Sequence, residues 1–201
     1  MKRILFSAIL GLVVSGGAFG QDADEEPISF RSPDGRYDLQ VTKVPNNNNQ
    51  EDSKLDLVET ASNKMVGDLG MVFSSQLSRS ILVWSTDSKR IAFGSGGDRH
   101  REITVYFWNG SAFESVPLPD DLPSPHIKFR KGANGAVKNY GGGVRPIRWL
   151  KSGALELSSE EMMLSRVDDM TYTGTIVITI AFDAQHHATV KKISKTKTRV
   201  E

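Results

Sequence analysis

Residues 94–102 (GSGGDRHRE) place five consecutive ionisable side chains on a glycine-rich base: Asp98, Arg99, His100, Arg101 and Glu102. A loop of this composition could bind an anion or contribute a general base. The sequence contains no G-x-S-x-G, H-E-x-x-H or P-loop motif to supply a matching nucleophile, metal site or phosphate cradle. Without such a partner, a solvated loop is the default interpretation, and Asp98, Arg99, His100 and Arg101 are the candidate contacts if the loop binds a ligand. The alternative is a hydrolase or metal-dependent enzyme that uses Asp98, His100 and Glu102.

A second set of possible ligands is Asp183, His186 and His187 in the segment DAQHH. Imidazole and carboxylate groups suit transition metals, and this set is the other candidate centre for a metal-dependent enzyme. Adjacent histidines in strand-like backbone point in opposite directions, so we expect a polar hairpin tip without a metal. The chain has no cysteine, which excludes thiolate zinc sites and cysteine catalysis. No cofactor is expected.

The longest acid-free stretch with dense positive charge runs from residue 122 to 154. Its candidate contacts are His126, Lys128, Arg130, Lys131, Lys138 and Arg145, accompanied by Phe129 and Tyr140. Such a loop could hold a carboxylated or phosphorylated envelope polymer, or an acidic protein surface. The alternative is a glycine-rich linker whose charges only keep it soluble.

The N-terminus has the pattern of a secretory signal peptide. Lys2 and Arg3 precede an apolar run over 4–14 and small residues up to Gly20. The run is shorter than the roughly 20 residues that span a bilayer, so we expect cleavage after Gly20, no membrane span, and a secreted or periplasmic protein. Removing two of the 25 Lys and Arg residues leaves 23 against 24 Asp and Glu. A nearly neutral exported chain is a poor candidate for nucleic-acid binding.

The elements that must position these residues are strands. We expect an acidic flexible leader over 21–26, a β domain over 27–194 and a flexible basic tail over 195–201. Asn109-Gly110 between two apolar runs predicts a hairpin with a two-residue turn. Residues 158–170 could form a helix, or a loop with a helical turn. Period-two patterns predict strands at 28–30, 37–44, 54–59, 81–85, 90–94, 103–108, 112–117, 145–150, 154–158, 171–182 and 188–193.

Three stretches of the sequence repeat one pattern, an apolar run followed by a polar turn. Aligning them places Asp34 on Asp87, Trp84 on Trp149, and Gly153 opposite Gly35 and Ser88. The units begin near residues 28, 80 and 144, and each can be read as four strands. Four strands at this period are typical of propeller blades.

The segments RSPDGRY (31–37) and WSTDSKRIAF (84–93) resemble the blade motif of TolB-like β-propellers, and WLKSGAL (149–155) resembles a degenerate copy. The resemblance implies about three antiparallel four-stranded blades. It also implies that residues 45–53, 94–102, 118–143 and 162–170 share one loop-bearing face. Propellers close with about 4 to 8 blades. Three blades would therefore stay open, or two copies would complete six as a homodimer; a β-sandwich is the alternative fold.

The apolar phase of the second unit differs from that of the other two. Ile91 and Phe93 are one residue out of step with Tyr37 and Leu39, which predicts a second turn that is longer by one residue or bulged. The expected role is that of a non-catalytic binding or scaffold module.

Overall fold

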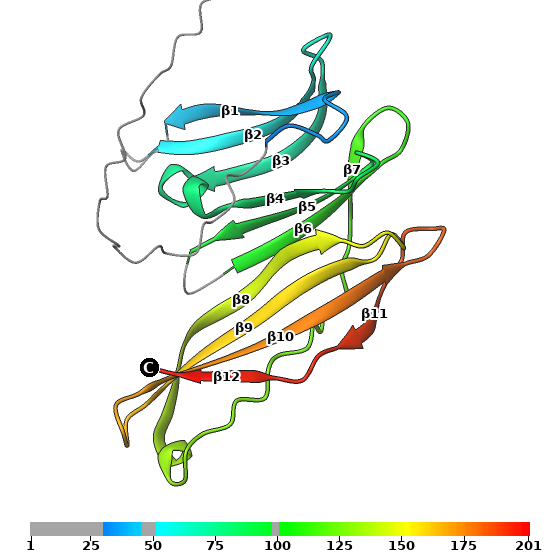
Figure 1. Ribbon diagram of the computed structural model, residues 1–201. Coiled ribbons are helices and arrows are strands. Elements are labelled where there is room, and N and C mark those ends of the chain that lie inside the picture. The colour runs from blue at the N-terminus through cyan, green and yellow to red at the C-terminus, as the bar shows by residue number, and fades with distance from the viewer. Residues whose placement is uncertain (1–29, 46–50, 98–100) are drawn as a thin grey trace, which may run out of the picture.

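The computed structural model describes residues 30–45, 51–97 and 101–201, which form three antiparallel β-sheets and two short 3-10 helices (Figure 1). The expected signal peptide, the leader and most of the first expected strand lie outside the described residues. The all-β prediction is confirmed. The described residues form three sheets, whereas the sandwich alternative would have two.

Sheet A contains β1 (Tyr37–Pro45), β2 (Glu51–Glu59) and β3 (Met65–Phe73) in that order. β3 was not predicted, because glycine and aspartate interrupt its apolar pattern. Gly67 is required there by packing: a Cβ at this position would lie 3.0 Å from Leu57 Cδ1 and 3.1 Å from Phe113 Cβ. The helix η1 (Ser74–Arg79) then leads into sheet B.

Sheet B contains β4 (Ile81–Trp84), β5 (Arg90–Gly96), β6 (Arg101–Trp108) and β7 (Phe113–Val116) in chain order, and all four strands were predicted. The predicted β6–β7 hairpin is confirmed, but its turn is centred one residue later than expected. Asn109 N donates to Ala112 O, so Gly110 and Ser111 are the central residues. Asn109 instead uses its side-chain oxygen to accept hydrogen bonds from the backbone of Ser111 and Ala112.

Sheet C follows η2 (Ala133–Ala136) and contains β8 (Val137–Trp149), β9 (Leu155–Ser165), β10 (Thr171–Phe182) and β11 (Ala188–Ile193). Its order is β11-β10-β9-β8, and β12 (Lys197–Val200) also pairs with β10.

Three expectations about this part of the chain were wrong. Residues 158–165 continue β9 instead of starting a helix, because every residue from Leu155 to Leu164 pairs with β10. The loop expected over 118–143 ends earlier, since β8 begins at Val137. The expected flexible tail contains β12, which pairs with Tyr172–Thr175 of β10.

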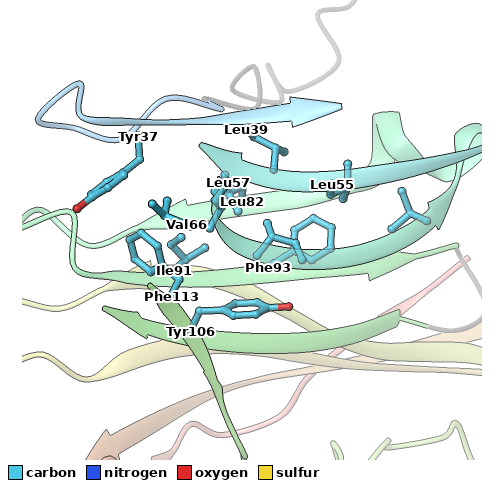
Figure 2. Close-up of a cluster of buried hydrophobic side chains, with 12 residues drawn as sticks. Tyr37, Leu39, Leu55, Leu57, Val66, Leu82, Ile91, Phe93, Tyr106 and Phe113 are labelled. Atoms are coloured by element: carbon cyan, nitrogen blue, oxygen red, sulfur yellow. The ribbon is translucent and has the colours of Figure 1, made fainter. Parts of the chain in front are cut away.

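The three sheets lie in layers in the order A, B, C, with one hydrophobic core on each side of sheet B (Figure 1). Between A and B, Leu55 and Leu57 of β2 pack with Ile91 and Phe93 of β5 (Figure 2). Between B and C, Ala92, Val105 and Phe107 pack with residues of sheet C. Because both faces of sheet B are buried, consecutive residues of β5 enter opposite cores.

Because β5 is buried on both faces, Ile91 and Phe93 can be apolar although they are one residue out of step with Tyr37 and Leu39. The prediction that the second turn is longer by one residue or bulged is wrong. The first and second turns close with the same spacing, Ser32 N to Tyr37 O and Ser85 N to Arg90 O. The third is shorter by one residue, from Leu150 N to Ala154 O. Ile91 and Phe93 therefore point back toward sheet A, as Leu155 and Leu157 point back toward sheet B.

The three turns share a local geometry. The amides of Gly35, Ser88 and Gly153 each donate to the carbonyl three residues earlier, and these residues have φ of 73°, 56° and 85°. Neighbouring turns are also joined. Asp34 N donates to Ser88 Oγ at 3.2 Å, and Arg90 Nη1 donates to Gly153 O at 3.2 Å. These contacts align the three sheets at their turn-bearing end.

Candidate functional site

The cationic segment between β7 and β8 does not project as a loop but packs on sheet C. Ile127 is buried, and Phe129 packs at a tilted angle against the buried ring of Tyr172 with centroids 4.9 Å apart. Gly174 of β10 makes room for this packing, because a Cβ there would lie 2.6 Å from Ile127 Cγ1. Ser165 Oγ donates to Ala133 O at 2.8 Å and fixes the end of the segment.

The backbone of this segment runs beside β12. His126 N donates to Thr196 Oγ1 at 3.1 Å, and Lys128 N donates to Thr198 Oγ1 at 3.4 Å. Exposure alternates along it: Ile127 is buried and Phe129 half-buried, whereas His126, Lys128 and Arg130 are exposed. The extended backbone therefore displays its basic side chains on one side, about 7 Å apart for residues i and i+2.

We call His126, Lys128, Arg130 and Lys131 the linker patch. All four side chains are exposed. Among the residues that the structure describes, no carboxylate forms an ion pair with any of the three cations. Their charge is available to a ligand.

Two other predicted residues of the segment lie farther away, on β8. Lys138 pairs with Leu164 near η2, whereas Arg145 pairs with Ser158. Seven residues of strand separate them by about 23 Å. The structure therefore places Lys138 at the η2 end of β8 and Arg145 well away from it, and neither residue belongs to the linker patch.

The glycine-rich loop is described only in part. Asp98, Arg99 and His100 lie outside the described residues, so the predicted anion-binding and enzymatic roles of this loop stay predictions. Arg101 begins β6 and forms an ion pair with Glu160, with Nη1 and Oε1 3.5 Å apart. Its Cβ also faces Gly143, where an added Cβ would lie 2.8 Å away. Arg101 thus joins sheets B and C, and Glu102 is exposed.

The groups at the β10–β11 turn separate instead of converging. His187 Nδ1 contacts Asp183 Oδ2 at 3.0 Å, while the ring of His186 lies on Phe107 with centroids 4.2 Å apart. Asp183 accepts backbone hydrogen bonds from Gln185 and His187. The bonds from His187 lower the pKa of Asp183, although partial burial opposes them. The carboxylate closes the turn, and no group of three or more His, Asp or Glu side chains in the described chain could hold a metal ion.

The acidic residue of the first turn is also structural. Burial raises the pKa of Asp34, but hydrogen bonds from the Arg36 backbone and guanidinium and from two serines outweigh this and hold it at about 2. Asp87 of the second turn has the same pattern, with Ser85 and the Lys89 backbone as donors and a lowered pKa.

The sequence reasoning missed the role of β12. Thr196, directly before the strand, and Thr198, within it, accept hydrogen bonds from the linker-patch backbone, and Lys197 and Arg199 alternate with them. The alternation KTKTRV was a usable signal for a strand, but its high charge favoured a tail.

Within the described ranges, no helix is long and apolar enough to cross a membrane. Comparison with known proteins found no family model, no curated protein and no solved structure that matches this chain.

Proposed function

We propose that this chain is an exported, non-catalytic binding module whose three sheets are propeller-like blades and whose linker patch holds an anionic polymer of the cell envelope. The signal-peptide pattern of residues 1–20 supports export. The equivalent turns support the blade interpretation. So does the strand order of each sheet, in which nearly all strands adjacent in the chain are adjacent in the sheet.

The observation that carries the ligand class is the single exposed row of His126, Lys128 and Arg130 on an extended backbone. A row of cations at regular spacing matches carboxylate or phosphate groups repeated along a flexible polymer. Ile127 and Phe129 anchor the backbone between them, so the row is held in place before a ligand arrives. An acidic protein surface, the other expected partner, would not need this regularity.

Charge reversal of the linker patch tests the proposal. The variant K128E/R130E/K131E should bind alginate, a carboxylated polysaccharide, at least tenfold more weakly than the wild type in 50 mM NaCl. Each exposed pair contributes about 0.2–1 kcal/mol, and three contacts become repulsive together. Biolayer interferometry on immobilised alginate, repeated on immobilised polyphosphate, measures the change in Kd.

The matched control is K64E/K89E/K151E, which changes the net charge equally. These exposed lysines lie in the turns at the opposite end of the sheets. The control should keep wild-type affinity. Equal losses in both triple variants would mean that only net charge matters, and binding to poly-glutamate without binding to alginate or polyphosphate would move the ligand to an acidic protein segment. Either result overturns the proposal.

A further inference from the structure

The outer face of sheet A, turned away from sheet B, is acidic. Directly paired residues of an antiparallel sheet share a face, and alternate residues along a strand share it too. The buried residues Leu55 and Leu57 mark the inner face. The register then places four aspartates and one lysine on the outer face: Asp38, Asp52, Asp56, Asp68 and Lys54. Lys54 forms an ion pair with Asp56, at 2.9 Å.

The same outer face carries an apolar row along its edge strand. Met65, Met71 and Phe73 of β3 pair with Val58, Lys54 and Asp52, so all three lie on the outer side. Their exposed fractions are 55%, 55% and 52%, which is high for large apolar side chains. Exposed apolar side chains bordered by charges are typical of protein interfaces.

The outer face of sheet C, at the other end of the stack, is basic. Leu155, Leu157 and Ile178 mark its inner face. The register places three glutamates on the opposite side, Glu156, Glu160 and Glu201; Glu160 reaches Arg101 of sheet B, and Glu201 forms an ion pair with Arg199 at 2.6 Å. Six cations outnumber them: Lys138, Arg145, Arg148, Lys192, Lys197 and Arg199. Arg148 and Glu156 form an ion pair across β8 and β9. The centre of this face on β10 is threonine-rich, with Thr171, Thr173, Thr175 and Thr179 in one row.

From this opposite charge we propose that the acidic face of sheet A in one copy of the chain docks on the basic face of sheet C in a second copy. A contact between two different surfaces of the same chain forms a closed ring or an open filament, depending on whether its rotation closes. Two copies would bring six sheets into one ring, within the usual range of propellers. Both outer faces would then be covered, in two equivalent contacts.

The available area is sufficient. A face of three nine-residue strands measures about 30 Å by about 14 Å. Two contacts, each covering two faces, would bury roughly 1,600 Å², the size of a standard specific interface. Opposite charges favour contact between the outer face of sheet A and the outer face of sheet C. Like charges disfavour contact between two sheet A faces or between two sheet C faces.

A reciprocal charge swap tests this pairing. The A-reversed variant is D38K/Q40K/D68K and the C-reversed variant is R145E/K192E/K197E; all six positions lie on the outer faces. Each variant alone has two outer faces of like sign and should be monomeric at 50 mM NaCl, where the wild type is dimeric. An equimolar mixture should form a 1:1 dimer, because each chain then meets the opposite sign at both contacts. Sedimentation velocity measures the three samples, and circular dichroism checks that each variant is folded.

If a triple variant does not fold, the single exposed substitutions D68K and K192E replace it; each should weaken dimerisation, and their equimolar mixture should dimerise more tightly than either variant alone. A monomeric wild type, a triple variant that dimerises by itself as tightly as the wild type, or a mixture of the two triple variants that stays monomeric would each overturn the proposal. The linker-patch variant K128E/R130E/K131E should still dimerise. Loss of polymer binding and loss of dimerisation can therefore be told apart.

Discussion

Replacing Trp149 with alanine should lower the free energy of unfolding by about 3–5 kcal/mol, as expected for a large aromatic side chain in a core. Only 9% of Trp149 is exposed, and its ring packs against Phe107 of sheet B at 5.9 Å and Phe182 of sheet C at 5.7 Å. Its Nε1 donates to Val83 O at 3.1 Å, and the Arg90 guanidinium lies over the ring at 5.3 Å. Trp149 therefore joins sheets B and C through several contacts. Urea unfolding measures the change.

The variant Trp149→Phe separates packing from hydrogen bonding. It keeps an aromatic ring in the core and loses the indole N–H, so we expect a smaller cost of about 1–2 kcal/mol. A loss below about 1 kcal/mol in Trp149→Ala would contradict the position of this residue between the two sheets.

Gly142→Ala should cost at least about 3 kcal/mol, because it combines backbone strain with a steric clash. Gly142 has a φ of 142°, and a Cβ there would lie 2.3 Å from Glu160 O and 2.9 Å from Glu161 Cα. The contacts are with the backbone of β9, which cannot move without breaking its pairing with β8 and β10. The same urea titration measures the loss.

Gly135→Ala is the matched control. It lies in η2 of the same glycine-rich stretch, and a Cβ there would meet nothing within 4 Å. We expect a change within about 0.5 kcal/mol. Equal effects at the two glycines would show that β8 does not pass this close to β9.

Local pattern predicted most of the strands because their apolar residues alternate between two well-defined sides. All four strands of sheet B were predicted. β5 is the exception to the alternation, because both of its faces are buried and its apolar residues are consecutive. The alignment of the turns anticipated the positive φ of Gly35 and Gly153, since glycine suits that backbone, and Ser88 adopts the same conformation at the aligned position.

The predictions for β9, β12 and the linker patch failed because contacts between distant parts of the chain decide the structure there. β9 contains the run SSEEMM, whose local preference resembles a helix start, but pairing on both sides with β8 and β10 outweighs it. β12 is highly charged and gains its order from β10 and from the segment that carries the linker patch. The sequence predicted the cations of that patch, but not that their segment packs on sheet C. The residues that anchor it, Tyr172 and Gly174, lie far along the chain.

The charge difference between the two outer faces could not be read from composition, because the chain is nearly neutral overall. It emerges only when the register assigns each aspartate and lysine to one side of a sheet.

Sedimentation velocity of the chain from residue 21 onward, at 50 mM and 500 mM NaCl, tests most directly whether a three-sheet stack with oppositely charged ends is completed by a second copy. We expect one species of twice the chain mass at low salt and a shift toward the monomer at high salt, where the Debye length shortens to a few Å. A monomer at both salt concentrations, or a salt-insensitive series of larger species, would contradict this account.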